Sequence, residues 1–502
     1  MNVLPDQASF TQHYQANEGQ LVYRQIITDT ETPITASLKL MEHYSPFFLL
    51  ESVEKAESKG RYSIIGIAPD MMFRCDAQKA QIARDGSAFE TVYAADGKPE
   101  NPVEVLRTLQ KASRLDIPAK LPPMASGLIG YMSYDAIRYV ETTIPDKNPD
   151  PIGIPLGIFM RPTIMVIFDA VTSSIYIIRT VHPQKAIASE TAYQNAIKDI
   201  EHITTLLSLP TATMKPTSAA ARSDSPVFTP HLSREAYYAI IAKAKDYILA
   251  GDIFQVVPSQ RFSAAFTLPP FSLYRSLRHL NPSPFLFFLD FNDFQLVGSS
   301  PEIMVRLRDD TVTIRPLAGT RKRGADAAED QKLSSELLAD EKELSEHLML
   351  IDLSRNDVGR IAKPGTVTVT EKMIIEYYSH VMHISSNVEG IIRPPFDALD
   401  ALFSALPVGT VSGAPKIRAM QIIDELESEK RSFYAGCVGY FSANGSMDTC
   451  IALRTGLIKN NTLYVQAGGG IVADSNPEAE YQEILNKAKA LMTAAQLAHA
   501  FA

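Results

Sequence analysis

Long parts of this chain consist of short apolar β-type segments that follow one another through tight turns. Residues 162–171 and 173–181 form one such pair, and residues 285–291 and 294–300 form another. Residues 436–473 hold several more, with Ala-Asn-Gly and Lys-Asn-Asn turns of the hairpin type. Strands joined by hairpins run antiparallel, whereas parallel strands need longer crossover connections. The sequence therefore predicts an α+β fold with largely antiparallel sheets flanked by helices.

A stretch rich in Pro, Ser, Thr and Ala, residues 209–231, interrupts this pattern. It contains almost no large apolar side chains, which is typical of a linker. The chain has 502 residues, more than one hydrophobic core usually organises. We therefore expect two domains, residues 1–208 and 232–502, on either side of the linker.

Helix signals appear in four segments. Ser233 is a candidate N-cap for a helix that ends at a Gly-Asp pair, and Asn476 followed by Pro477 marks the start of a C-terminal helix. Apolar spacings of three and four residues support the assignments. The predicted helical segments are 102–113, 233–252, a single long charged helix over 328–357, and 476–500.

Composition narrows the possible partners. The formal net charge of -9 argues against nucleic acid, and no apolar run is long enough to cross a membrane. The first residues lack the basic and apolar regions of a secretory signal. The three cysteines, Cys75, Cys437 and Cys450, form no C-x-x-C pair, so we expect a reducing, cytoplasmic location. Any anionic ligand must be bound by local cations, backbone N–H groups or a metal.

Two of the predicted helices carry paired carboxylates three residues apart, a spacing that places both on one helical face. The pairs are Glu343 with Glu346 and Glu480 with Glu483. Brought together, these faces would offer the oxygen ligands that Mg²⁺ prefers. A solvated charged face is the simpler interpretation, and for the first pair alone it is the better one. The second pair is less easily dismissed, because Lys487 extends its face by one turn.

Other polar features are ambiguous when each is taken alone. The segment RPLAGTRKRG, residues 315–324, places four basic residues around a glycine and could attract an anion. The glycine triplet 468–470 either exposes backbone N–H groups to a ligand or forms a bulged turn. Arg454 alternates with apolar neighbours and so needs an internal anion, which is either a ligand or a salt-bridge partner.

Three titratable side chains and one small-residue segment are similarly ambiguous. Glu302 follows a Ser-Ser-Pro turn and could be a poised acid, but a surface glutamate is the favoured interpretation of this position taken alone. His380 and His383 lie in a strand, where packed, hydrogen-bonded histidines are commoner than catalysts. Small residues before a helix that begins near Ala414 can present N–H groups to an anion.

Together, these motifs closely resemble the chorismate-utilising enzyme family. The resemblance is carried, in order, by PLAGTRKRG, DEKELSEHLMLIDLSRNDVGR, VMHISSNVEG, LPVGTVSGAPKIRAM, CIALRT and QAGGGIVADSNPEAEYQE. The first half adds FFLLESVEKAESKGRYSIIG, which is similar to the amino-terminal region of the anthranilate-forming members. The resemblance implies the fold of that family, with two intertwined domains.

The resemblance also implies a substrate and its ligands. Chorismate is a dianion, and its ring carboxylate would be bound through Mg²⁺ held by Glu346 and Glu483, with Glu343 and Glu480 in support and Lys487 nearby. The residues that would contact the enolpyruvyl carboxylate are Arg454, Tyr434, Gly468, Gly469 and Gly470. Those that would line the remaining wall are Gly319, Thr320 and Thr410.

Two positions at which this chain differs from other family members indicate which nucleophile attacks the ring. Hydrating members carry a lysine base where this chain has Gln255, and aminodeoxychorismate synthases carry a lysine where it has Ala318. Their absence implies direct attack by ammonia at C2, with Glu302 as general acid. His383 would then assist loss of pyruvate from 2-amino-2-deoxyisochorismate to give anthranilate.

Regulation and partners are implied in the same way. No cysteine lies in an amidotransferase-type nucleophile motif, so a separate glutamine amidotransferase subunit would supply ammonia. A feedback site for tryptophan would include Glu51, Ser52, Pro284, Leu286, Val438, Gly439 and Tyr440, with leucine at 286 in place of the commoner methionine. Two alternatives are an enzyme that stops at the aminated intermediate and a non-catalytic, tryptophan-sensing subunit.

Overall fold

Antiparallel strands form the centre of the protein. The computed structural model describes residues 3–27, 29–52, 60–210, 225–378 and 381–502. Within them, twenty-one strands join in one hydrogen-bonded network, and a two-stranded ladder lies beside it. All the strand pairings described are antiparallel, which confirms the predicted sheet type.

The elements before the predicted linker are mostly strands. The strands are β1 Gln20–Ile27, β2 Phe47–Glu51, β3 Tyr62–Cys75, β4 Ala80–Arg84, β5 Glu90–Thr91, β6 Gly127–Met132, β7 Gly157–Asp169 and β8 Ser174–Val181. The helices are α1 Gln7–Gln15, α2 Pro33–Met41, α3 Pro102–Ala112 and α4 Ser189–Ser208, with a short 3₁₀ turn, η2, at Tyr134–Tyr139.

The elements after it mix strands and helices. The strands are β9 Thr229–Pro230, β10 Gln255–Val256, β11 Ser259–Ala265, β12 Phe285–Asp290, β13 Gln295–Ser300, β14 Ile303–Arg308, β15 Thr311–Ile314, β16 Leu317–Lys322, β17 Thr368–Tyr377, β18 Val381–Ile391, β19 Gly413–Ala414, β20 Cys437–Ser442, β21 Met447–Ile451, β22 Thr455–Lys459 and β23 Thr462–Gly468. The helices are α5 Arg234–Leu249, α6 Pro270–Leu280, α7 Ala327–Leu338, α8 Glu341–Gly359, α9 Ala398–Ala405, α10 Gly409–Ser412, α11 Lys416–Leu426 and α12 Pro477–Leu497.

Strand pairing links the two halves of the chain. Glu51 of β2 lies opposite Leu286 of β12, and Met132 of β6 lies opposite Cys437 of β20. Each half therefore completes the sheet of the other, as expected for intertwined domains of the predicted α+β class. The domain boundaries 1–208 and 232–502 remain a prediction from the sequence. Residues 211–224 of the linker lie outside the described part of the chain.

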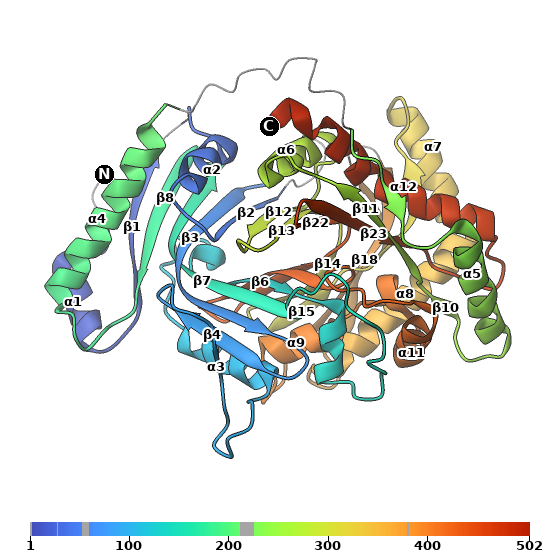
Figure 1. Ribbon diagram of the computed structural model, residues 1–502, viewed down its shortest axis with the longest axis horizontal. Helices are drawn as coiled ribbons and strands as arrows, with labels where there is room; N and C mark the ends of the chain where they lie inside the picture. Colours follow the sequence, from blue (N-terminus) through green and yellow to red (C-terminus); the bar gives the residue numbers. More distant parts are fainter. Residues whose placement is uncertain (1–2, 28, 53–59, 211–224, 379–380) are drawn as a thin grey trace.

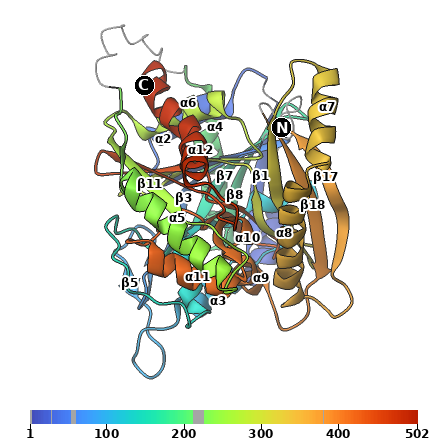
Figure 2. The ribbon, with the colours of Figure 1, turned by 90° about the vertical axis from the view of Figure 1, so that its right-hand side faces the viewer.

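Helices lie along several sides of the sheet (Figure 1). Figure 1 shows α1, α2 and α4 together beside β1 and β8. Figure 2 shows α5 and α12 side by side, with α8 packed against β18 and α7 next to α8. The helices α8 and α12 carry the two pairs of carboxylates. None of the described helices is long and apolar enough to cross a membrane.

Side-chain capping explains where these helices begin. At Asp340 the cap contradicts the single helix that the sequence predicts. Ser233 and Asn476 cap α5 and α12 through their side chains, as predicted. The single helix predicted over 328–357 is wrong, because the structure has α7 and α8 there. The Asp340 carboxylate accepts hydrogen bonds from the backbone N–H groups of Lys342 and Glu343, which starts a new helix.

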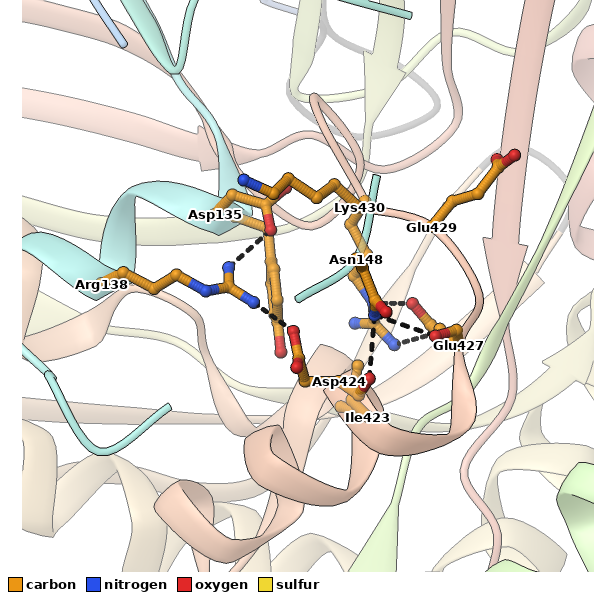
Figure 3. A pocket seen from close by; sticks show the side chains of 10 residues that line it. Asp135, Arg138, Asn148, Ile423, Asp424, Glu427, Glu429 and Lys430 are labelled. Carbon is orange, nitrogen blue, oxygen red and sulfur yellow. Dashed lines mark hydrogen bonds and ion pairs between the residues drawn. The ribbon is translucent and has the colours of Figure 1, made fainter. Parts of the chain in front are cut away.

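A buried charged network joins the halves away from the strands. Arg138 of η2 forms ion pairs with Asp135 and with Asp424 of α11, as Figure 3 shows. The other oxygen of Asp135 accepts a hydrogen bond of 2.9 Å from the backbone N–H of Ser432. Removing either partner would leave a buried charge uncompensated, so this contact holds η2 against α11.

Strand sharing predicts that neither half folds alone. Expressed separately, residues 1–208 leave one side of β2 and of β6 unpaired, and residues 232–502 do the same to β12 and β20. We expect each half to aggregate, and coexpression to yield a soluble complex that elutes as one species in size-exclusion chromatography. A monomeric 232–502 chain with cooperative urea unfolding would contradict this expectation.

Candidate active site

Glu302 is a buried acid that retains its proton near neutral pH. It lies between β13 and β14, is 6 % exposed, and accepts a hydrogen bond of 3.1 Å from the Thr410 hydroxyl of α10. Burial raises the pKa of Glu302 to about 8, against the opposing effects of Thr410 and the Lys487 charge. The surface alternative considered for this glutamate is therefore wrong, and its carboxyl group can donate a proton.

His383 has the opposite electrostatic character. It lies on β18, and its Nδ1 is 3.0 Å from the carbonyl oxygen of Gly319 and 3.1 Å from the Thr320 hydroxyl. Because a carbonyl only accepts, we assign the ring proton to Nδ1, which leaves Nε2 free to accept a proton. Burial lowers the pKa of His383 to about 4, so the ring is neutral at physiological pH. His380 lies outside the described residues.

Gly319 supplies that carbonyl from an unusual backbone conformation. Its φ is +61°, in the left-handed region, at an irregularity of β16 between Ala318 and Thr320. A Cβ atom at Gly319 would lie 3.0 Å from Cδ1 of Leu337 and 3.2 Å from Oε2 of Glu343. Only glycine meets both requirements without strain.

A cavity of about 50 Å³ separates His383 from Arg454. Arg454 lies between β21 and β22 with a φ of +47°, and burial lowers the pKa of its guanidinium. Its side chain forms no ion pair or hydrogen bond within the described residues, so the salt-bridge alternative is not supported there. A partly buried guanidinium without a carboxylate partner among the described residues favours an anionic ligand. The other residues that line the cavity are Asn281, Pro282, Ser283, Pro301, Tyr378 and Val381.

The two pairs of helical carboxylates approach one another. Burial raises the pKa of Glu346, with further contributions from the nearby charges of Glu343 and Glu483. Burial also raises the pKa of Glu480, again with a contribution from Glu483. The α8 and α12 acids therefore repel one another in a partly buried region.

These acids suit a cation with few protein ligands. No group of three or more His, Cys, Asp or Glu with metal-binding geometry occurs in the described ranges. Mg²⁺ needs only one or two carboxylates, with water and substrate oxygens completing its coordination. One Glu346 oxygen accepts 2.9 Å from Gln255 Nε2, and Lys487 Nζ lies 2.7 Å from Glu483. An additional positive charge would relieve the remaining repulsion, so the oxygen-only donor set fits Mg²⁺.

The glycine triplet packs against other predicted site residues. A Cβ atom at Gly468 would lie 2.8 Å from the Tyr434 hydroxyl, and one at Gly470 would lie 2.5 Å from Gln255 Nε2. One at Gly469 would lie 3.5 Å from a Glu480 oxygen. Because these three glycines lack side chains, their backbone can approach Tyr434, Gln255 and Glu480 closely. Burial raises the pKa of Tyr434 to about 12, so its hydroxyl remains a donor.

The basic segment 315–324 has a structural role. Arg315 pairs with Glu371 and Glu376, and Arg321 lies 2.9 Å from Asp340 and 3.2 Å from Glu343. The remaining arginine of the segment, Arg323, pairs with Asp330. Lys322, the fourth basic residue of the segment, is exposed. The cations whose charges act on Glu302 and His383 are Lys487 and Arg454.

The predicted tryptophan residues fall into two groups. Glu51 of β2 faces Leu286 of β12 and accepts hydrogen bonds from Tyr274 and Arg278. Ser52 directly follows β2, and Pro284 directly precedes β12. Val438, Gly439 and Tyr440 are buried in β20, between β6 and β21. No described contact joins the two groups, so this site remains a prediction.

Two contacting residues were missed from the sequence. The ring of Tyr378 packs edge-on to His383, with centroids 5.5 Å apart, and lines the same cavity. Arg431, fully buried, packs against the Tyr434 ring. The tyrosine pair before His383 was a usable signal for the first, whereas no local pattern marks the second.

The buried Glu302 should give a characteristic pH dependence of stability. Its folded-state pKa of about 8 lies above the ordinary value of 4.5, so its contribution is fully present below pH 4.5 and is lost as the pH rises to about 8. We expect Glu302→Gln to gain stability relative to the wild type over this interval, measured by urea unfolding. The matched control is Glu341→Gln, the same change at an exposed position. Equal pH dependence in the two variants would contradict the assignment.

Known proteins resemble this chain over nearly its whole length. The chorismate binding enzyme family model matches residues 45–493. Anthranilate synthase component 1 of Cereibacter sphaeroides is 51 % identical over 98 % of both chains, and that of Pseudomonas aeruginosa is 46 % identical over 94 % of both. The crystal structure of anthranilate synthase component I from Streptococcus pneumoniae is 36 % identical with a TM-score of 0.74, covering 93 % of this chain and 99 % of that one.

A more distant structure shares the fold alone. The menaquinone-specific isochorismate synthase of Escherichia coli has a TM-score of 0.68 at 20 % identity, covering 97 % of this chain and 98 % of its own. The match to the family model and the close relatives leave no ambiguity about descent. This chain belongs to the chorismate binding enzyme family, in its anthranilate synthase component 1 branch.

Proposed function

We propose that this protein is the large subunit of an anthranilate synthase. It combines chorismate with ammonia to give anthranilate and pyruvate, through 2-amino-2-deoxyisochorismate, at the entry to tryptophan biosynthesis. One observation carries the proposal, together with the family: a protonated Glu302 and a neutral His383 lie in a region faced by the cations of Arg454 and Lys487. That combination suits acid–base chemistry on a dianion.

Substrate binding uses the Arg454 cation, which has no partner within the described residues, together with nearby donor groups. The enolpyruvyl carboxylate is bound by Arg454, the Tyr434 hydroxyl and the backbone of Gly468 to Gly470. The ring lies against Gly319, Thr320 and Thr410. In an acidic protein, these local groups offset the repulsion between protein and substrate.

The first step is amination. Ammonia attacks C2 of the ring, the double bonds shift, and the bond from C4 to its hydroxyl breaks. Glu302 gives its proton to the departing hydroxyl, so water leaves. Gln255 and Ala318 offer neither a base nor a nucleophile, which favours ammonia over water or a protein adduct. The Gln255 Oε1 atom is buried and has no partner within the described residues, so it can accept an N–H hydrogen bond.

The second step is elimination. Nε2 of His383 accepts the proton from C2 as the bond from C3 to the enolpyruvyl oxygen breaks. The enolpyruvyl group leaves as an enolate, which takes up a proton to give pyruvate, and the ring becomes aromatic. The Gly319 carbonyl orients the imidazole for this transfer by accepting from Nδ1.

Mg²⁺ would be held by Glu346 and Glu483, with Glu343 and Glu480 in support and Lys487 beside the same carboxylate. When bound, it supplies electrostatic activation by drawing electron density toward the ring carboxylate. The shared repulsion of these glutamates supports the assignment.

Ammonia comes from a separate glutamine amidotransferase subunit. The component 1 naming of the relatives supports the existence of a second component. The three cysteines are free and buried, which suits the proposed cytoplasmic location and offers no amidotransferase nucleophile in this chain. Tryptophan inhibits at the site that includes Glu51, Ser52, Pro284, Leu286 and the β20 residues Val438, Gly439 and Tyr440.

The direct test supplies this chain alone with chorismate, Mg²⁺ and ammonium at mildly alkaline pH. We expect anthranilate fluorescence and pyruvate in equal amounts, abolished by a chelator and reduced by tryptophan. The chain contains no Trp, so protein emission is low. Chorismate loss without either product would identify an enzyme that stops after amination, and no consumption would favour the non-catalytic sensor.

His383→Ala should separate the two steps. We expect chorismate consumption to continue, while anthranilate formation falls by roughly 10²–10⁴-fold, as for loss of a general base. Mass spectrometry should then detect 2-amino-2-deoxyisochorismate. The control is His279→Ala, at an exposed position on α6. Normal anthranilate turnover by His383→Ala would remove this residue from the mechanism.

A further inference from the structure

A buried arginine ties together the segments that carry the active site. Arg431 is 1 % exposed and lies in the turn after α11. Its Nε and Nη2 atoms donate to the Glu427 carboxylate at 2.9 and 2.6 Å. Its Nη1 donates to the Val411 carbonyl at 2.7 Å, and Nη2 also donates to the Val257 carbonyl. Burial opposes the charged form, but the Glu427 carboxylate holds the pKa of Arg431 above its ordinary value.

Both carbonyls belong to segments with assigned roles. Val411 follows Thr410 in α10, and Thr410 donates to Glu302. Val257 directly follows β10, whose Gln255 donates to Glu346. One planar guanidinium therefore fixes two backbone segments whose side chains reach two different acids.

The partner of Arg431 extends this connection to the glycine loop. One oxygen of Glu427 accepts from the backbone N–H of Ser259 at 2.8 Å and from its hydroxyl at 2.9 Å. The Ser259 hydroxyl also accepts from Gln466, on β23 two residues before Gly468. The Arg431–Glu427 pair thus contacts the segments that lead to Thr410 and Gln255, and it reaches the segment of Gly468 through Ser259.

Two aromatic rings pack against the guanidinium. The Tyr434 ring lies 5.6 Å away, and the ring of Tyr134, from the first half of the chain, lies 4.7 Å away. Next to this pair is a cavity of about 10 Å³, near the lower limit for one water molecule. Figure 3 shows that Arg138 there is directed to Asp135 and Asp424, so Glu427 remains the partner of Arg431.

We infer that Arg431 is a positioning residue, which sets Thr410 against Glu302 and Gln255 against Glu346 through the carbonyls of Val411 and Val257. A buried ion pair brings little stability over apolar packing, because both charges lose their hydration. Lysine has one nitrogen and cannot reproduce the four contacts, whereas the fork of arginine can. The roles of Glu302 and Gln255 rest on the proposed function, but the contacts do not.

The test reads the protonation of Glu302 in Arg431→Lys. Infrared spectroscopy follows the carboxyl band during a pH titration, and Glu302→Gln assigns the band. The groups that face Glu302 are Thr410, the backbone of Leu317, Lys487 and Tyr378. Since the Thr410 hydrogen bond lowers the pKa of Glu302, displacing Thr410 should raise it above about 8. Thr410→Val gives the reference shift.

The Glu302 pKa shift of the double variant tests whether Arg431 acts on Glu302 through Thr410. We expect Arg431→Lys and Thr410→Val each to raise the Glu302 pKa, and the double variant to show no more than the Thr410→Val shift. The matched control is Arg261→Lys, a buried arginine paired with Glu429 that contacts neither carbonyl. It should lose stability without moving the Glu302 titration.

Either outcome is decisive. A folded Arg431→Lys protein with an unchanged Glu302 titration, or fully additive shifts, would reduce Arg431 to a purely structural role. Should Arg431→Lys fail to fold, Glu427→Gln keeps the side-chain shape while loosening the fork, and the same shift is expected of it. A coupled Glu302 shift in a chain that makes no anthranilate would uphold the positioning role and reject the proposed function.

Discussion

Backbone hydrogen bonding between the two halves of the chain is the constraint on which the site depends. The β2–β12 and β6–β20 ladders place strands from before and after the linker in one sheet. Every residue assigned to the chorismate site lies in the second half of the chain. Arg431, whose contacts hold segments of that site, packs on Tyr134 of the first half. The proposed tryptophan residues lie on strands of those same ladders or directly beside them. An effector bound there would therefore act on strands continuous with the catalytic scaffold.

Within that scaffold, burial controls the chemistry. The same removal from water raises the pKa of Glu302 and lowers the pKa of His383, because in each case it disfavours the charged form. The result is a protonated acid and an unprotonated base at one pH. Few of the described cations near the site lack a carboxylate partner. The arginines of the 315–324 segment are neutralised by nearby carboxylates and Lys487 pairs with Glu483, whereas Arg454 has no carboxylate partner within the described residues.

Local signals in the sequence anticipated local structure well. Ser233 and Asn476 cap their helices as predicted, and the hairpin turns produced antiparallel strands. The failure at 328–357 is also local in origin: the charged residues there suit a helix throughout, but Asp340 competes for the backbone N–H groups and starts a second one. The site residues came from the resemblance to a family, because the local pattern around Glu302 taken alone favours a surface position.

By itself, the sequence determined the sheet type, the helix starts and the family, because turn residues, caps and long motifs are read over a few neighbouring positions. Only the tertiary structure decided which charges are neutralised and which acids keep their protons. Thr410 reaches Glu302 across 108 positions, and Arg431 reaches Val257 across 174. Burial and electrostatic environment arise from such distant contacts, so no window of the sequence contains them.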